Sequence, residues 1–323
     1  MYKRQIEGYR FFCNKIWNAY RFVAGHLDEV EFRQTRVADL TLRLPDRWIL
    51  SRLTETIQGV TEAFGAYRFN DAASILYQFL WHEYCDWYLE IVKTRLAGSE
   101  DEASKRTGRI LLIHVLEQSL RLLHPIMPFI TEEIWQRLPH EGSSIMVAAW
   151  PQADPAFRWP EATEIMTYLM EITREVRNIR SNYNVSPAKR VPLLLRTASP
   201  GHDAALEACH DYLISLARLS QLSWGRTAAR PDVAATAVVR GVEIHLPLEG
   251  LIDLREERDR LRKELTKVEQ ALDRVSRKLG NEEFLAKAPE GVVSQQKAIQ
   301  VELQDALARH RENLGRIEAH LKR

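Results

Sequence analysis

Hydrophobic residues recur three or four positions apart through most of the first part of the chain. The spacing runs through residues 4–27, 46–67, 70–96 and 101–124. Positions three and four apart share one face of a helix, so each stretch predicts a helix with one buried side. In the first helix the buried stripe would consist of Tyr9, Phe12, Ile16 and Val23. Asp46 is predicted to cap the second helix, and together the helices predict an α-helical bundle over residues 1–138.

The last helices of this bundle meet at a corner, in the stretch LLHPIMPFITEEIWQRLP at residues 122–139. Proline lacks an amide donor and clashes with the preceding helical turn, so Pro125 should end one helix. Pro128 suits the first turn of the next helix. We expect a rigid corner of the bundle with no chemistry of its own.

The middle of the chain, residues 139–250, combines a loop, a helix and several short extended runs. The loop is rich in Pro, Gly and Ser and includes SIMVAAW (144–150), interpreted as a short extended piece, before a helix from Pro160 to Tyr183. Short apolar or alternating runs bounded by Pro and Gly are typical of strands. Such runs are VPLLLR (191–196), QLSW (221–224), ATAVV (235–239) and VEIHLPL (242–248). With one helix at about 203–218, they predict a small α+β subdomain.

From residue 251 to 323 the pattern changes to a heptad repeat. Apolar residues from Leu254 to Leu279 lie three, four or seven positions apart, and a second such series runs from Ile299 to Leu321. Pro289 interrupts the helix between them. Two helices of this kind joined by a short connection predict an antiparallel coiled-coil hairpin, each helix on the order of 40–45 Å long. The predicted fold class is therefore mainly α: a helical bundle, a small α+β subdomain and a coiled-coil hairpin.

Composition narrows the classes of function. The 323 residues are 45% hydrophobic and 28% charged with a net charge of +1, so no overall field favours nucleic acid or membrane, and such binding would need local clusters. Three widely spaced cysteines fit a reducing compartment and form no disulfide or metal pattern. The chain contains no signal peptide and no apolar run of roughly 18 residues. These features predict a cytoplasmic protein with neither DNA nor a membrane as partner.

The sequence contains no recognisable catalytic or cofactor-binding motif. The P-loop pattern GxxxxGK[ST], the dinucleotide pattern GxGxxG, the zinc motif HExxH and paired CxxC motifs are all absent. We therefore predict no catalytic, metal or cofactor residues in this chain, and a function that depends on binding.

The first helix has a mostly polar second face, made of Asn14, Lys15, Asn18 and Arg21 together with Phe22. An aromatic ring among amides and cations is suited to stacking on a nucleobase. Packing of Phe22 against a neighbouring helix explains the same spacing. Glu83, Asp86 and Glu90 likewise share a face of the third helix, where they could be solvated or could accept hydrogen bonds from base amines.

Basic residues gather locally in the helix after Pro160 and in the coiled coil. Arg174, Arg177 and Arg180 recur every three positions, and Lys189 and Arg190 follow them. Residues 168–196 contain six Lys or Arg against two Glu. A solvated face and a face that contacts phosphates both fit this pattern.

Several motifs together resemble the C-terminal part of a class I aminoacyl-tRNA synthetase of the valyl type. They are IEGYRFFCNKIWNAYRFV (6–23), DRWILSRL (46–53), YCDWYLE (84–90), LLHPIMPFITEEIWQRL (122–138), EVRNIRSNYNVSPAKR (175–190), PLEGLIDL (247–254) and NEEFLAKAPEGVV (281–293). The first four are shared more loosely with isoleucyl and leucyl relatives, whereas the hairpin with NEEFLAKAP is typical of the valyl branch.

The resemblance implies roles for these faces. The bundle resembles the anticodon-binding domain, with Phe22 as the residue that stacks on a base and Glu90 as a nearby acceptor. The other residues implied near the anticodon are Asn14, Lys15, Asn18 and Arg21. The hairpin resembles the arm that reaches the outer corner of the tRNA. The residues expected to contact tRNA phosphates are Arg174, Arg177, Arg180, Lys189, Arg274, Arg277, Lys278 and Lys287.

The same resemblance limits what this chain does alone. The family's catalytic and editing domains lie upstream of these motifs, and its HIGH-like and KMSKS-like sequences are absent here. We therefore expect a monomeric, catalytically inactive tRNA-binding fragment beginning at Met1, specific for valine tRNA, of an enzyme that uses ATP elsewhere. The alternatives are a protein–protein scaffold built on the hairpin and the matching part of an isoleucyl-type synthetase.

Overall fold

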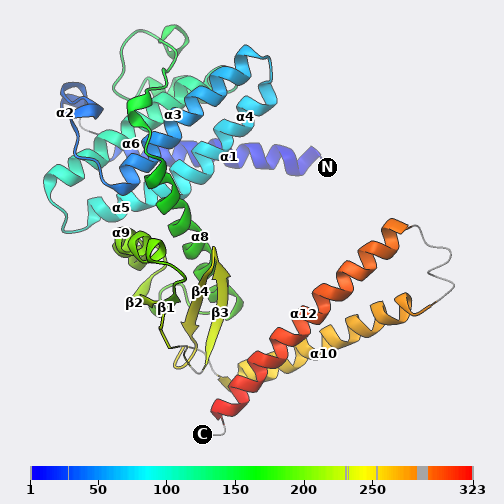
Figure 1. The fold of residues 1–323 in the computed structure, drawn as a ribbon. Helices are drawn as coiled ribbons and strands as arrows, with labels where there is room; N and C mark the ends of the chain where they lie inside the picture. The colour runs from blue at the N-terminus through cyan, green and yellow to red at the C-terminus, as the bar shows by residue number, and fades with distance from the viewer. Residues whose placement is uncertain are drawn as a thin grey trace. The chain divides into compact units, whose positions relative to one another are not determined.

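The computed structural model describes residues 2–27, 29–229, 231, 233–251, 254–281 and 290–321 (Figure 1). The chain is mainly helical with one small sheet, and it divides into two compact units. Unit 1 contains residues 1–170 and 205–216, and unit 2 contains residues 171–204 and 217–323. The mainly α fold class is confirmed, while the functional division at residues 138 and 250 stays a prediction.

Unit 1 is a bundle of helices. Its long members are α1 (Tyr2–Ala24), α3 (Leu44–Gly65), α4 (Phe69–Tyr77), the π-helix η2 (Gln78–Tyr88), α5 (Leu89–Ala97) and α6 (Glu102–Leu123). Shorter members are α2 (Glu29–Gln34), the 3₁₀ turn η1 (Val37–Asp39), α7 (Pro128–Trp135) and the 3₁₀ turns η3 (Ile145–Val147) and η4 (Pro155–Phe157). Helices α8 (Pro160–Asn182) and α9 (Pro200–Leu216) each contribute one part to this unit and one to unit 2.

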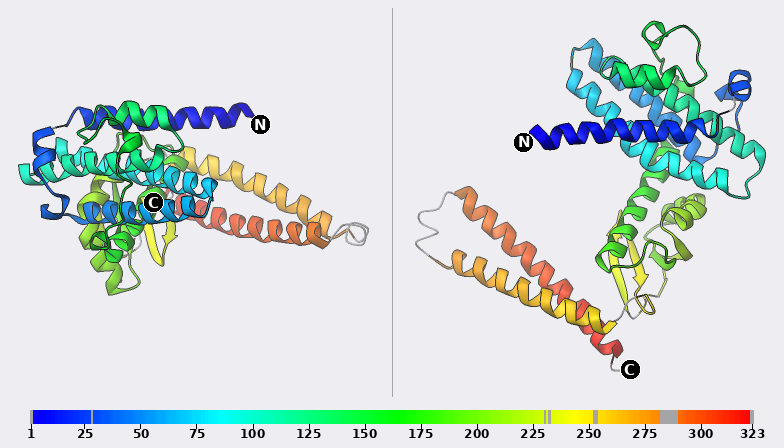
Figure 2. Two further views of the ribbon diagram at one scale, coloured as in Figure 1. Left: turned by 90° about the horizontal axis from the view of Figure 1, so that it is seen from above. Right: turned by 180° about the vertical axis from the view of Figure 1, so that it is seen from behind.

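The bundle interior is filled by aromatic and branched side chains. Trp48, Tyr84, Tyr88 and Trp135 are completely or almost completely buried, as the apolar spacing predicts. Tyr9 differs from the prediction, because 71% of its surface is exposed. Residues 8–11 are all exposed, since the first turns of α1 extend beyond the other helices (Figure 2). The core stripe of α1 therefore begins at Phe12.

Two local predictions in unit 1 are wrong. Asp46 lies in the first turn of α3 rather than at its N-cap, where its carboxylate accepts a hydrogen bond from the backbone amide of Arg43 at 3.0 Å. The stretch SIMVAAW forms the 3₁₀ turn η3 instead of an extended piece, because the Ser144 hydroxyl accepts from the amide of Met146 and caps the turn.

Unit 2 contains a four-stranded sheet in the order β2-β1-β4-β3. Its strands are β1 (Val191–Arg196), β2 (Leu219–Gly225), β3 (Ala234–Val239) and β4 (Val242–Pro247). Strands β1 and β2 are parallel and are connected through α9, whereas β4 is antiparallel to both β1 and β3. Arg240 and Gly241, both at positive φ, form the two-residue turn from β3 to β4. The predicted α+β subdomain is confirmed.

The coiled-coil hairpin consists of α10 (Leu254–Leu279) and α12 (Glu290–Leu321), which lie side by side in opposite directions (Figures 1 and 2). Three cross-helix contacts give its register: Arg262 with Glu318, Glu269 with Arg311, and Ser276 with Gln300. Seam residues are the more buried ones along both helices, with Leu261 and Ile317 each 2% exposed. The predicted antiparallel hairpin is confirmed.

Candidate functional site

The polar face of α1 lies beside η2 and α5. Asn14, Asn18 and Arg21 are exposed, whereas Lys15 and Phe22 are half-buried because they contact the neighbouring helix. Positions 15, 18 and 22 share one side of a helix. The structure therefore brings the predicted residues of α1 together on a single surface.

Lys15 is held by side chains of the π-helix. Its Nζ lies 2.5 Å from Oδ1 of Asp86 and 4.9 Å from the ring centroid of Trp81. The second carboxylate oxygen of Asp86 lies 3.3 Å from Nδ1 of His82. A cation between a carboxylate and an indole has little freedom, so Lys15 presents its charge in a defined place.

Phe22 and Glu90 meet through a residue that the sequence analysis did not identify. Nζ of Lys93 lies 5.2 Å from the Phe22 ring centroid and 2.7 Å from Oε1 of Glu90. On its own helix, Phe22 contacts the ring of His26 at 4.5 Å between centroids. Lys93 lies three residues after Glu90 in sequence, a helical spacing that could have identified it. The ring thus packs against a cation and an imidazole while part of its surface stays accessible.

Cys85 lies beneath these two ion pairs. Its thiol is buried, and burial raises its pKa to about 12, with the charges of Lys15, Asp86, Lys93 and Glu90 all close enough to influence it. The charges of both ion pairs therefore act on the same buried thiol. The thiol itself stays protonated at neutral pH and has no nucleophilic character there.

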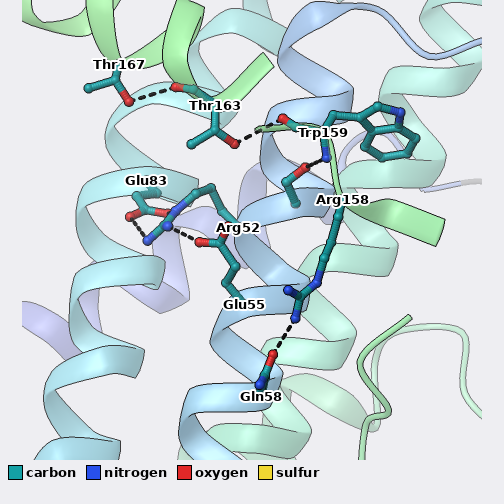
Figure 3. Close-up of polar contacts among 9 residues, drawn as sticks. Arg52, Glu55, Gln58, Glu83, Arg158, Trp159, Thr163 and Thr167 are labelled. Atoms are coloured by element: carbon teal, nitrogen blue, oxygen red, sulfur yellow. Dashed lines mark hydrogen bonds and ion pairs between the residues drawn. The ribbon is translucent and has the colours of Figure 1, made fainter. Parts of the chain in front are cut away.

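The orientation of η2 depends on Arg52 of α3, which the sequence analysis did not single out. Its guanidinium donates Nε to Oε2 of Glu83 at 2.8 Å and Nη2 to Oε1 at 2.9 Å, and it also pairs with Glu55 (Figure 3). A bidentate contact fixes both distance and angle. Glu83 therefore points into the bundle, while Asp86, three residues later, points toward α1. Of the three acidic residues predicted to share a face, Glu83 is therefore neither solvated nor accessible to a base, whereas Asp86 on η2 and Glu90 on α5 remain candidates.

The start of α8 is anchored on α3 as well. The backbone amide of Trp159 donates to the Ser51 hydroxyl at 2.8 Å, and Arg158 bonds Gln58 (Figure 3). Within α8, the hydroxyl of Thr167 donates to the carbonyl of Thr163 at 2.7 Å. These contacts define where the helix with the basic stripe begins.

The basic stripe of α8 is not uniform. Arg174 and Arg177 are exposed, but Arg180 is only 6% exposed and its guanidinium is surrounded by backbone carbonyls. It donates to the carbonyls of Ser186 at 2.9 Å, Lys189 at 2.7 Å, Ala217 at 3.1 Å and Arg218 at 3.3 Å. Because its N–H donors are already bonded to these carbonyls, the buried guanidinium of Arg180 is not available to bind a phosphate. We therefore correct the predicted set by removing Arg180.

The remaining predicted cations lie on the surface of unit 2. Lys189 is exposed, and its Nζ donates to the carbonyl of Gly250 at 2.7 Å. On α10, Arg274, Arg277 and Lys278 are exposed, and Arg277 pairs with Asp273 one turn earlier at 2.8 Å. Lys287 lies outside the described residues.

The described part of the chain offers little for other kinds of site. There, no group of three or more His, Cys, Asp or Glu side chains is placed to hold a metal ion. No described helix is both long enough and apolar enough to cross a membrane. A cavity of about 430 Å³ between α2, α6 and the loop after α7 is lined by His114, Glu117 and Arg121, among others, and by none of the six predicted anticodon residues.

Two family models match the chain. The anticodon-binding domain of tRNA ligases matches residues 46–195, and the valyl-tRNA synthetase tRNA-binding arm matches residues 253–318. The first match covers α3 to β1 and begins after α1. The second covers the coiled-coil hairpin.

Similar proteins extend the likeness to nearly the whole chain. A valine–tRNA ligase of Oceanobacillus iheyensis is 44% identical over 316 residues, which are 97% of this chain and 35% of that protein. The valine–tRNA ligases of Bacillus subtilis and Geobacillus stearothermophilus are 44% and 45% identical over 293 residues, which are 91% of this chain and 33% of each protein. The chain thus spans about a third of the length of the curated relatives it matches.

Proposed function

We propose that the chain belongs to the valyl-tRNA synthetase family and acts as the tRNA-binding part of a valine–tRNA ligase. Both matched domains are tRNA-binding modules, and together they account for the bundle and the hairpin. The rest of such an enzyme would activate valine with ATP and transfer it to the tRNA. Valine tRNA as partner, a monomeric state and a cytoplasmic location belong to the same proposal.

The bundle surface between α1 and α5 is proposed to read the anticodon. The observation that supports this best is the pairing of a half-buried, partly accessible Phe22 ring with two ordered ion pairs, Lys15–Asp86 and Glu90–Lys93. Bases of an RNA loop are unstacked and can be bound on an aromatic face while their edges are read by polar side chains. Asn14, Asn18 and Arg21, exposed on the same helix, would supply further donors and acceptors.

The hairpin is proposed to contact the outer corner of the tRNA through phosphates. Arg274, Arg277 and Lys278 are exposed cations near the end of α10, and Lys287 follows in sequence. Arg174, Arg177 and Lys189 would contact phosphates elsewhere on the tRNA. Such contacts position the RNA without reading its sequence.

The proposal is tested by binding of the purified chain to valine tRNA and to a variant tRNA with only the anticodon changed, at two salt concentrations. Loss of a stacked base costs about 1–3 kcal/mol, so Phe22→Ala should weaken binding of valine tRNA by roughly fivefold to 150-fold and reduce discrimination between the two tRNAs. Phe129→Ala on α7 is the matched control, because Phe129 is 91% exposed in the same unit.

Equal binding of both tRNAs that collapses at higher salt would contradict anticodon reading by the bundle and would leave phosphate contacts as the main source of affinity. If neither tRNA binds, the scaffold alternative gains support.

A further inference from the structure

Two arginines of unit 2 that have no assigned role are neighbours at the start of the parallel strands. Pairing of β1 with β2 begins at Val191 opposite Leu219, and the amide of Val191 donates to the carbonyl of Arg218 at 3.2 Å. Arg190 and Arg218 therefore occupy the adjacent positions just before the paired residues. Neighbouring strands lie about 4.8 Å apart, so the two arginine side chains start from neighbouring backbone positions.

The backbones that bear these arginines are held together by Arg180. Its single guanidinium donates to the carbonyl of Lys189 on one segment and to the carbonyls of Ala217 and Arg218 on the other. Arg190 adds a contact of its own, donating Nη1 to the carbonyl of Leu219 at 3.1 Å. The relative position of the two segments is thus set by buried hydrogen bonds, which keeps the two exposed arginines at a fixed spacing.

The backbone at Arg218 is unusual for an arginine. Its φ is 53°, in the left-handed region where Gly and Asn are more easily accommodated. Turn geometry alone does not require a long cationic side chain at this position. Residues kept in such conformations often have a functional reason for their side chain.

Positive charge accumulates around these segments. Arg177 is exposed one turn before Arg180 on α8, and burial together with the charges of Arg218 and Arg177 lowers the pKa of Arg180. Among the described residues, no carboxylate forms an ion pair with Arg190 or Arg218. The electrostatic cost of this arrangement would be relieved by a bound anion.

We infer that Arg177, Arg190 and Arg218 form a phosphate-binding surface for the backbone of an RNA. The inference rests on the proposed function and extends it to Arg218, which the sequence analysis did not name, and to Arg190, which lies in the basic stretch but was not among the expected phosphate contacts. All three side chains are exposed, as expected for a surface that follows a sugar–phosphate backbone. Such a surface would add affinity without reading sequence.

The test is the salt dependence of valine tRNA binding by the double variant Arg190→Gln/Arg218→Asn. Asparagine tolerates the left-handed conformation, so the second substitution removes charge without adding strain. Each lost phosphate contact should reduce the slope of log K against log salt by about 0.7–0.9, and the pair should reduce it by about 1.5. Affinity at physiological salt should fall about tenfold. Arg218→Lys, which keeps the charge, should retain most of the binding.

The matched control is Arg196→Gln, an exposed arginine at the opposite end of β1, roughly 20 Å from Arg190 at about 3.3 Å per residue. Unfolding curves of each variant show whether the fold is kept. Unchanged slope and affinity in the double variant, or an equal loss in the control, would overturn the inference while the proposed function stands. If the unmodified chain binds no tRNA at all, the proposed function fails, and this inference fails with it.

Discussion

The bundle contains a buried ion pair, whereas the described ion pairs of the coiled-coil hairpin reach solvent. In the bundle, Asp46 is fully buried and Arg95 is 4% exposed, and their ion pair at 3.1 Å joins α3 to α5. In the hairpin, the paired side chains reach solvent: Arg262 is exposed and Glu318 half-buried in the pair between the helices, and Arg277, 79% exposed, pairs with Asp273 within one helix.

This difference in the exposure of ion pairs affects both the stability of each region and the ability of its charges to bind a ligand. A buried pair cannot lose one partner without leaving a charge in a medium of low polarity, so it fixes the geometry of the elements it joins. An exposed pair is worth little and is screened by salt, so its cation can exchange a carboxylate for a phosphate. The buried pair therefore stabilises the arrangement of α3 and α5, whereas under the proposed function the exposed cations of the hairpin remain available to the RNA backbone.

The largest expected effect comes from breaking the buried pair. Arg95→Met would leave Asp46 buried with Tyr88 as its remaining side-chain donor, at 2.9 Å, and should lower the free energy of unfolding of unit 1 by about 3–5 kcal/mol. Denaturant unfolding followed by tryptophan fluorescence measures this, since Trp48 and Trp135 lie in the bundle core. The control Arg68→Met removes an exposed partner of Asp71 and should cost less than about 1 kcal/mol. Equal losses of unfolding free energy in Arg95→Met and Arg68→Met would contradict the difference between buried and exposed ion pairs.

A smaller effect should appear as a pH dependence of bundle stability. Burial, with a further contribution from the charge of Arg121, lowers the pKa of His114 from 6.5 to about 4. Between these values the unfolded chain binds a proton at this residue and the folded chain does not. Stability should therefore fall as the pH drops from 6.5 toward 4, by at most about 1.4 kcal/mol per pH unit.

Thermal unfolding of the unmodified chain and of His114→Gln across this pH range isolates the contribution, because all other titrating groups are shared. The variant should show the shallower decline below pH 6.5. Parallel curves of stability against pH for the two proteins would mean that protonation of His114 does not destabilise the folded state.

The smallest effect is expected in the hairpin. Arg262→Gln removes an ion pair whose side chains are 55% and 32% exposed and should cost less than about 1 kcal/mol. A double-mutant cycle with Glu318→Gln, followed by thermal unfolding of α10 and α12, measures the coupling. The coupling should disappear at about 1 M salt, where the screening length is roughly 3 Å. A coupling energy as large as that of the buried bundle pair would remove the distinction between the two regions.

Local periodicity was sufficient to predict most of the elements. The spacing of apolar residues located the bundle helices, the alternation between residues 191 and 248 located the strands, and the heptads located both helices of the hairpin. Periodicity depends only on residues close together in sequence, so it can be recognised without knowledge of the fold. The same spacing placed Lys15, Phe22 and Glu90 on candidate surfaces.

The errors share a different cause. Tyr9 fits the core stripe of α1 but has no neighbouring helix to cover it, and Asp46 looks like a cap but meets Arg95, which is 49 positions away. Arg180 has the same spacing as Arg174 and Arg177, yet carbonyls from two later segments enclose it. Each outcome depends on residues distant in sequence.

The sequence by itself determined the kinds of element, their order, the family resemblance and the helix faces that bear charge, because these depend on residue types at short spacing. Only the tertiary structure decided which charges are buried and which are available, because burial depends on the elements that pack over a side chain. Tertiary packing buries Arg180 while the arginines around it stay exposed. Strand pairing brings Arg190 and Arg218 to neighbouring positions although they lie 28 positions apart in the chain.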